Sequence, residues 1–362
     1  MRLQHFHQLR PLCLACRAVD PTRESGLTIS HVVRQENNDL LEGLLRCGDP
    51  DCQYEYPVID GIPYLLTSLP EFLAANAEMI QARTDLSPLI KGVIADCTGP
   101  ESSFNITRQH LSSYGWCHYE DLNPDNCDDT AGSTSRLLTE LPCPVDGAKI
   151  ANGPVVDLGC AVGRTTFELA VETNQLVLGI DLNVAMLRTA SAVLREGRIR
   201  YPLRRVGVVY DEQDFPHQFE QSDNVDFWAC DVTNLPFSDA TFSACVSLNT
   251  LDSVASPLGL LHSIARVLEP HSAARIACPY DWTASVTQMQ GWIGGHSQRA
   301  DHGGRSESVL QQILSNRTEL SQHLEIVQEC QDIPWTVRVH DRSRMVYRLH
   351  GVVLQRADNG AF

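Results

Sequence analysis

A glycine-bearing turn between an apolar strand and a helix is the part of the sequence with the most evident chemistry. The segment 155–169 reads VVDLGCAVGRTTFEL, so that Asp157, Gly159 and Gly163 occupy the turn. Glycines let the backbone approach a ligand closely, and the first turn of a helix offers N–H groups without intrahelical partners. The pattern therefore predicts a binding site for a nucleotide-like ligand. A tight strand-to-helix turn without any ligand is the alternative.

Two further acids follow the next strands of this region. Asp181 ends the strand LVLGID, and Asp231 follows the strand VDFWAC. In a parallel sheet with helices on both faces, the carboxyl ends of the strands meet in one crevice, where an acid can accept hydrogen bonds from ribose hydroxyls. We expect Asp181 to bind a ribose and Asp231 to lie near an adenine. The spacing lacks the Gly-x-Gly-x-x-Gly fingerprint of dinucleotide-binding dehydrogenases.

Residues 151–356 resemble the class I S-adenosylmethionine-dependent methyltransferases. The resemblance rests on Asp157-x-Gly-x-x-x-Gly, Ile180-Asp181, Asp231-Val with NLPF at 234–237, FSACVSLN at 242–249 and IARVLEP at 264–270. It implies an α/β fold with a Rossmann-like seven-stranded sheet and a terminal antiparallel hairpin. The cofactor-binding residues that it implies are Asp157, Gly159, Ala161, Gly163, Asp181, Leu182, Asp231, Val232 and Asn249.

Within the resemblance, each part of the cofactor has its own residues. Gly159 and Gly163 would hold the methionine part, and Asn249 would lie near the sulfonium. The sequence departs from the family pattern at two places. Ala161 stands where the family commonly has a third glycine, and PHS at 270–272 replaces Pro-Gly-Gly before the fifth strand, which alters a turn.

Four cysteines near the beginning of the sequence have the spacing of a metal site. Cys13 and Cys16 form a Cys-x-x-Cys pair, and Cys47 and Cys52 are separated by four residues. Two close thiolate pairs can ligate Zn²⁺ tetrahedrally, and the protein then fills all four positions, so we predict a structural zinc. Residues 56–66 (YPVIDGIPYLL) resemble the strand and turn of small zinc ribbons that activate methyltransferases as separate subunits. Four free thiols are the alternative.

The segment after the fifth strand carries a second resemblance. CPYDW at 278–282 and GWIGGH at 291–296 are similar to elements of the methyltransferase domain of ovothiol biosynthesis enzymes, as is GCAVGR at 159–164. That domain methylates an imidazole nitrogen of 5-thiohistidine. The resemblance implies a small imidazole substrate. The zinc-ribbon-like segment is an added part of this chain.

Candidate side chains for this reaction lie before, within and after the cofactor region. For catalysis or proton acceptance we consider Asn249, Tyr280, His296, His340 and Asp341. Trp282, Trp292 and Trp335 could wall a flat ring, Arg338 or Arg342 could pair with a carboxylate, and Tyr347 could bind the amino group. Tyr114 could close over the methionine end. The alternative for the tryptophans is packing in the core, and for the two arginines it is a solvated charge on the hairpin. For Tyr114 the alternative is a role in a helix cap.

The elements that must position these residues divide the chain into three parts. Residues 1–67 form a zinc-ribbon-like domain, residues 68–150 a helical connector with a linker over 121–150 that contributes to the substrate side, and residues 151–362 the methyltransferase domain. Strands at 155–158, 176–180, 225–229, 244–248 and 274–277 alternate with helices at 165–173, 184–196 and 258–268. Runs at 335–339 and 345–353 predict the closing hairpin.

Composition limits the possible functions. The chain has 362 residues, an apolar fraction of 43% and a net charge of −17. The acidic charge disfavours nucleic acid as a substrate, and the sequence has neither an apolar membrane span nor a secretory signal, so we expect a cytoplasmic protein with reduced thiols. A small-molecule substrate and a homodimer are the expected partners. Two alternatives stay open: an RNA methyltransferase with an N-terminal zinc site, and a non-catalytic scaffold.

Overall fold

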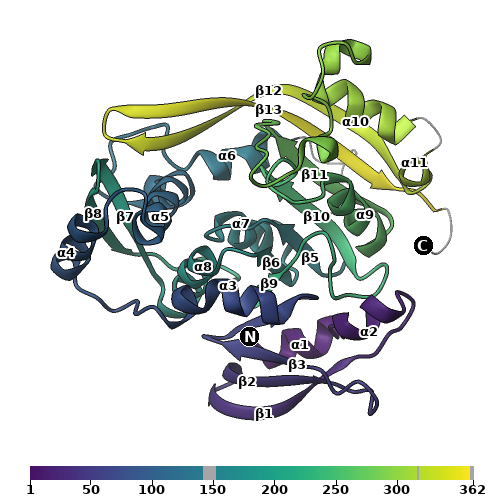
Figure 1. The fold of residues 1–362 in the computed structure, drawn as a ribbon, viewed down its shortest axis with the longest axis horizontal. Coiled ribbons are helices and arrows are strands. Elements are labelled where there is room, and N and C mark those ends of the chain that lie inside the picture. Colours follow the sequence, from purple (N-terminus) through teal and green to yellow (C-terminus); the bar gives the residue numbers. More distant parts are fainter. Residues whose placement is uncertain (142–151, 316–317, 359–362) are drawn as a thin grey trace.

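The computed structural model describes residues 1–141, 152–315 and 318–358, which alternate between helices and strands (Figure 1). The helices are α1 (Leu3–Leu9), α2 (Leu14–Val19), α3 (Leu69–Gln81), α4 (Pro88–Thr98), α5 (Ser103–Tyr119), α6 (Ser133–Glu140), α7 (Arg164–Thr173), α8 (Val184–Glu196), α9 (Pro257–Val267), α10 (Ser306–Ser315) and α11 (Glu319–His323). The strands are β1 (Leu27–Glu36), β2 (Asp39–Cys47), β3 (Glu55–Ile59), β4 (Ile62–Leu65), β5 (Val155–Leu158), β6 (Val177–Asp181), β7 (Arg198–Val206), β8 (Val209–Pro216), β9 (Val225–Cys230), β10 (Phe242–Leu248), β11 (Leu268–Cys278), β12 (Leu324–His340) and β13 (Ser343–Arg356).

A seven-stranded segment of the main sheet has the order β9-β6-β5-β10-β11-β13-β12. Its first five strands are parallel, and β13 enters antiparallel between β11 and β12. The order reverses at β5, so that the crevice between the carboxyl ends of β5 and β10 is the switch point at which such sheets bind ligands. The expected seven-stranded fold with a terminal hairpin is confirmed.

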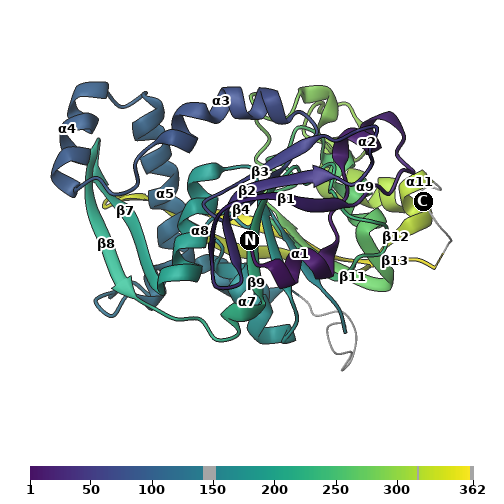
Figure 2. The same cartoon turned by 90° about the horizontal axis from the view of Figure 1, so that it is seen from below.

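The N-terminal segment continues the same sheet beyond β9. Strands β1 to β4 form an antiparallel run, and β4 pairs in parallel with β9 through Tyr64–Ala229 and Leu65–Cys230. Within the described residues the sheet therefore has eleven strands. Figure 2 shows β1 to β3 beside the central strands, with α1 and α2 next to them. The expected domain boundary at residue 67 stays a prediction. The hydrogen bonds between β4 and β9 join the residues before and after this boundary in one sheet.

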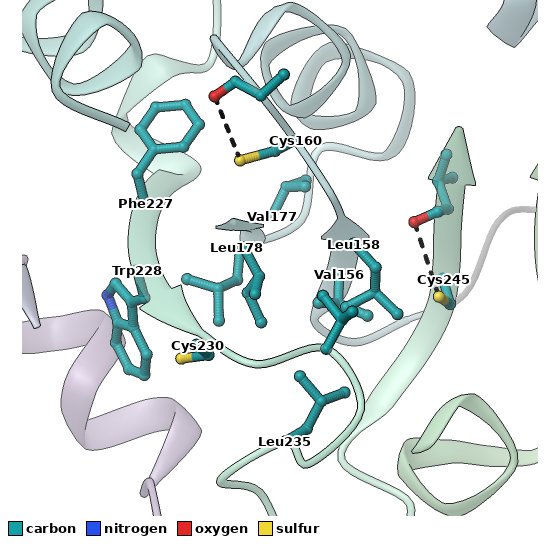
Figure 3. Close-up of a cluster of buried hydrophobic side chains, with 14 of the residues drawn as sticks. Val156, Leu158, Cys160, Val177, Leu178, Phe227, Trp228, Cys230, Leu235 and Cys245 are labelled. Atoms are coloured by element: carbon teal, nitrogen blue, oxygen red, sulfur yellow. Dashed lines mark hydrogen bonds between the residues drawn. The ribbon is translucent and has the colours of Figure 1, made fainter. Parts of the chain in front are cut away.

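The centre of the sheet is apolar on both faces. Every residue of β5 and of β9 is buried, as is typical of a central parallel strand covered by helices on both sides. Figure 3 shows part of this core, in which Val156, Leu178 and Trp228 meet side chains of the neighbouring strands. Cys160, Cys230, Cys245 and Cys278 are buried there, where a thiol packs as a small apolar side chain.

Three expectations about individual elements need correction or extension. Residues 121–141 are not all loop, because α6 forms there and packs Leu137 into the core; residues 142–150 of the expected linker lie outside the described residues. The β7–β8 hairpin was not expected. The closing hairpin is longer than the two apolar runs, since β12 has 17 residues and β13 has 14. None of the described helices has the length and the apolar character required to cross a membrane.

Candidate active site

The glycine turn lies between the end of β5 and the beginning of α7. Gly159 and Gly163 have φ values of +83° and +95°, and Ala161 has +49°. A Cβ atom at Gly159 would lie 2.1 Å from Oγ1 of Thr250, and one at Gly163 would lie 2.7 Å from the ring of Phe227. Both glycines are therefore required by conformation and by the close approach of neighbouring side chains.

Asp157 supports the turn from inside the protein. Its Oδ2 accepts hydrogen bonds from the hydroxyl groups of Thr165 (2.5 Å) and Thr166 (2.7 Å) in the first turn of α7. Burial raises the pKa of Asp157 to about 6. The carboxyl group thus joins the end of β5 to the beginning of α7 and fixes the backbone that separates them.

Asp181 connects the turn to the next strand. Its Oδ2 accepts a hydrogen bond from the backbone N–H of Ala161 (2.9 Å), and its Oδ1 accepts one from Asn183 (2.8 Å). Burial raises the pKa of Asp181. Each carboxylate oxygen can accept a further hydrogen bond, as the two hydroxyls of a ribose would require. The neighbouring Leu182 is 40% exposed and offers an apolar surface beside this acid.

Side-chain hydrogen bonds hold the loop after β9. Oδ1 of Asp231 accepts hydrogen bonds from the backbone N–H (2.8 Å) and the hydroxyl (2.7 Å) of Thr233. Val232 is buried, and Asn234 donates a hydrogen bond to Oγ1 of Thr67 at the end of the N-terminal segment (2.8 Å). Asp231 and Val232 thus follow the strand next to the one that ends in Asp181.

The segment after β10 contains an acid that the sequence analysis missed. Asn249 has a φ of +55°, and its buried Oδ1 has no hydrogen-bond partner among the described residues. Asp252 is only 3% exposed, and its Oδ2 accepts a hydrogen bond from the backbone N–H of Asp281 (2.6 Å). Burial raises the pKa of Asp252. The sequence signal that could have indicated Asp252 is its position three residues after Asn249.

Three aromatic rings after β11 follow one another in space. The ring centroids of Tyr280 and Trp282 are 6.1 Å apart, and those of Trp282 and Trp292 are 6.2 Å apart, with interplanar angles of 28° and 16°. The indole N–H groups of Trp282 and Trp292 donate hydrogen bonds to Ser306 and to the carbonyl of Thr287. The structure therefore brings these three predicted residues together.

Residues of α5 and β13 approach the same region. The hydroxyl of Tyr347 donates a hydrogen bond to Oδ2 of Asp281 (3.3 Å), and its ring lies 5.2 Å from that of Trp335. Burial raises the pKa of Tyr114, and the charges of Asp181 and Asp252 raise it further. Both the acid after β6 and the acid after β10 are therefore near enough to act on the charge of Tyr114. Trp335 itself is buried, and its indole N–H donates to Thr134 of α6.

Other candidates lie at the tip of the closing hairpin. Arg338 is buried, pairs with Asp341 and donates a hydrogen bond to the carbonyl of Arg204 (2.9 Å). It is three residues from Trp335 along β12, or roughly 10 Å. His340 and Arg342 belong to the same turn, where the backbone N–H of Arg342 donates to Nδ1 of His340. The structure does not bring these four side chains to the aromatic rings.

His296 is the remaining candidate. Its side chain is exposed, and its Nδ1 lies 3.4 Å from the carbonyl oxygen of Gly294. The neighbouring Gly295 lies against the indole of Trp282, so that His296 follows directly after the aromatic group. No described contact joins the imidazole to Asp252 or Tyr280.

The site fits S-adenosylmethionine as its ligand. Asp181 has acceptor capacity for the ribose, and Leu182 beside it offers an exposed apolar face. The buried Oδ1 of Asn249 is an orphan acceptor at the switch point, and burying such an atom without a partner is costly. Acidic side chains also favour a ligand that carries a sulfonium and an ammonium group.

The four N-terminal cysteines form a compact cluster. All four Sγ atoms lie within 4.8 Å of one another; Cys13–Cys52 is 3.8 Å and Cys16–Cys47 is 3.6 Å. Sulfur atoms around Zn²⁺ at the usual distance of about 2.3 Å are about 3.8 Å apart. Hydrogen bonds to sulfur, which support thiolate ligands, come from the Asp49 N–H and are possible from the Tyr56 hydroxyl. The donor set therefore fits zinc.

Comparison with known proteins agrees with this site. Residues 156–276, from β5 to β11, match a family described as a methyltransferase domain. The O-methyltransferase resE of Aspergillus sclerotiorum is 22% identical over 153 residues, which are 41% of this chain and 50% of that protein. The chain thus spans about half the length of this curated relative.

Solved structures of similar fold include a SAM-dependent methyltransferase of Methanosarcina mazei, which is 18% identical, with 60% of this chain and 98% of that chain covered and a TM-score of 0.37. Another is a complex between the Trm112 methyltransferase activator of Haloferax volcanii and a methyltransferase. The matched chain is 16% identical, with 62% of this chain and 89% of that chain covered and a TM-score of 0.35.

The strand order, the glycine turn and the matched family define a class I S-adenosylmethionine-dependent methyltransferase domain. The four-cysteine segment extends the sheet of this domain through β4 and β9.

Proposed function

We propose that this protein transfers a methyl group from S-adenosylmethionine to a ring nitrogen of 5-thiohistidine. The proposal extends the methyltransferase class to a particular substrate. S-adenosylmethionine supplies an electrophilic methyl group on its sulfonium. The protein then has to hold the substrate nitrogen in line with that methyl group and to exclude water, which together lower the barrier by several kcal/mol.

The observation that carries the proposal is the combination of flat rings with one buried acid, Asp252, and one exposed acid, Asp281, beside the cofactor crevice. Tyr280, Trp282 and Trp292 lie in series, which suits a flat heteroaromatic ring. Within the described part of the chain, Asp252 and Asp281 form no ion pair, and they can bind the ammonium group of an amino acid. Tyr114, whose pKa is raised by burial and by the charge of Asp252, would close the methionine side.

Two features disfavour the RNA alternative. The whole chain has a net charge of −17, and the segment 1–67 has six Lys and Arg against nine Asp and Glu, so that this segment offers no excess of positive charge to a phosphate backbone. The same acidity suits a small zwitterion. We further propose that the four cysteines hold a structural Zn²⁺ and that the protein acts in the cytoplasm, where thiols stay reduced. A homodimer also remains part of the proposal.

The test is a direct methylation assay. Purified full-length protein is incubated with S-adenosylmethionine and 5-thiohistidine, and the products are analysed by mass spectrometry. We expect a gain of about 14 Da on the imidazole, as the replacement of a hydrogen by a methyl group requires. Histidine, which lacks the thiol, serves as a control for the requirement of that group. A short RNA hairpin serves as the control for the alternative substrate. Methylation of the RNA, or none of the thiohistidine, would overturn the proposal.

A further inference from the structure

Tyr280 is backed by two residues that the sequence analysis did not select. Its hydroxyl lies 2.7 Å from Nδ1 of His350, and Nε2 of His350 lies 2.8 Å from Oε1 of Glu329. His350 is only 4% exposed. The three side chains come from the end of β11, from β13 and from β12, and the antiparallel pairing of Cys278 with His350 brings them together.

The hydrogen bonds of this group have one consistent direction. Burial raises the pKa of Tyr280, so that its hydroxyl keeps its proton and can donate to Nδ1 of His350. A neutral imidazole that accepts at Nδ1 carries its hydrogen on Nε2, and this hydrogen is donated to the Glu329 carboxylate. The oxygen lone pairs of Tyr280 are then available to accept a hydrogen from a ligand.

Glu329 is held as an acceptor by further donors. Nε2 of Gln311, from α10, lies 2.8 and 3.0 Å from its two carboxylate oxygens, and Nε2 of Gln331 lies 2.9 Å from Oε1. Other charged or titratable groups that act on Tyr280 are Cys278 on its own strand, Asp252 after β10 and Glu307 on α10. This fixed carboxylate can stabilise a positive charge on His350.

We propose that Tyr280, His350 and Glu329 form a proton relay that accepts the hydrogen of the substrate ring. The inference rests on the proposed function. As the substrate nitrogen bonds to the methyl carbon, the carbon–sulfur bond breaks and sulfur keeps its electron pair. The methylated ring loses the proton of its other nitrogen to the Tyr280 oxygen, while the Tyr280 proton moves to Nδ1 of His350. Glu329 pairs with the resulting imidazolium. Tyr280 is the catalytic residue, and His350 and Glu329 act through it.

The proposal is tested with Tyr280→Phe, His350→Asn and Glu329→Gln, and Glu325→Gln serves as the matched control on the same strand. Glu325 is exposed. We expect kcat for 5-thiohistidine to fall about 100-fold in the first two variants and about tenfold in Glu329→Gln, in the range of general acid–base contributions. KM should change less than about threefold, because binding is retained. Calorimetry should give unchanged affinity for S-adenosylmethionine, and Glu325→Gln should behave as the wild type.

A second measurement needs no substrate. The ¹⁵N signals of His350, assigned by their loss in His350→Asn, should show a neutral ring with its hydrogen on Nε2, and Tyr280→Phe should shift the Nδ1 signal. A hydrogen on Nδ1 in the free protein would overturn the relay, and so would variants that raise KM and leave kcat unchanged. A wild type that does not methylate 5-thiohistidine, with the Nε2 tautomer present, would instead refute the proposed function.

Discussion

At the scale of single residues, buried acids dominate the site. Asp157 and Asp252 are buried and Asp181 is half-buried, and removal from water raises the pKa of each. Removing a carboxylate from water costs free energy, which the protein offsets in part by hydrogen bonds from hydroxyl and backbone groups. The site is thus built at the expense of stability, as is common where a protein concentrates charge for binding.

We predict that Asp157→Asn stabilises the fold in a pH-dependent way. Because the folded protein holds the proton of Asp157 up to pH of about 6, above the usual range, the wild type loses stability as the pH rises from about 4 to about 6. The variant avoids this loss and should be more stable at pH 7 by roughly 2–3 kcal/mol. Urea unfolding at pH 4 and pH 7 measures the difference. As a control, Asp223→Asn at an exposed position should not change the free energy of unfolding at either pH. An equal effect of Asp157→Asn at both pH values would contradict the prediction.

At the scale of elements, the four-cysteine segment supports the loop after β9. The backbone N–H of Leu12 donates to the carbonyl of Pro236 (2.8 Å), and the guanidinium of Arg17 donates to that of Phe237 (3.1 Å). Each of these residues is next to a cysteine of the cluster. The metal-site geometry and the loop that begins at Asp231 are therefore mechanically connected.

We predict that Arg17→Ala weakens the binding of S-adenosylmethionine about fivefold, or roughly 1 kcal/mol, because the loop after Asp231 loses one support. The metal content should stay unchanged, since no sulfur ligand is removed. Calorimetry and metal analysis measure the two properties separately. Arg34→Ala, at an exposed position of β1, is the control. Loss of the metal in Arg17→Ala would point to a folding defect instead.

The central elements could be predicted from the sequence because their signals are local. Buried strands such as β5 and β9 are short apolar runs, and Asp181 and Asp231 follow directly from their ends. The β7–β8 hairpin was missed because most of its residues are polar or charged and few of them, such as Ile199 and Tyr201, are buried. His350 could not be found, since its place beside Tyr280 depends on the register of β11 with β13.

At the scale of the whole molecule, one apolar core extends from the N-terminal segment to the closing hairpin. Leu14 and Tyr56 near the cysteines, Val156 in the central sheet and Leu354 in β13 are all fully buried. The small N-terminal segment shares its sheet with the methyltransferase domain through β4 and β9. Its folding should therefore affect the cofactor site.

We predict that removing the metal from the four-cysteine cluster reduces the affinity for S-adenosylmethionine about tenfold, which corresponds to about 1.4 kcal/mol. The wild type should contain about one zinc per chain. Calorimetry before and after treatment with a chelator measures the effect. Cys97→Ser and Cys127→Ser, at exposed cysteines outside the cluster, should keep both zinc and affinity. A fully folded protein without metal and with unchanged affinity would contradict this prediction.

The pairing of β4 with β9 has a consequence for assembly. Among the described strands of the eleven-stranded sheet, those with an open side are β1 and β12, because β9 already has a neighbour on each side. A separate regulatory subunit cannot add a strand at β9 without first displacing β4, which is covalently attached. A subunit that extends this eleven-stranded sheet by strand addition must therefore dock at one of its two outer strands, far from the cofactor crevice in sheet order.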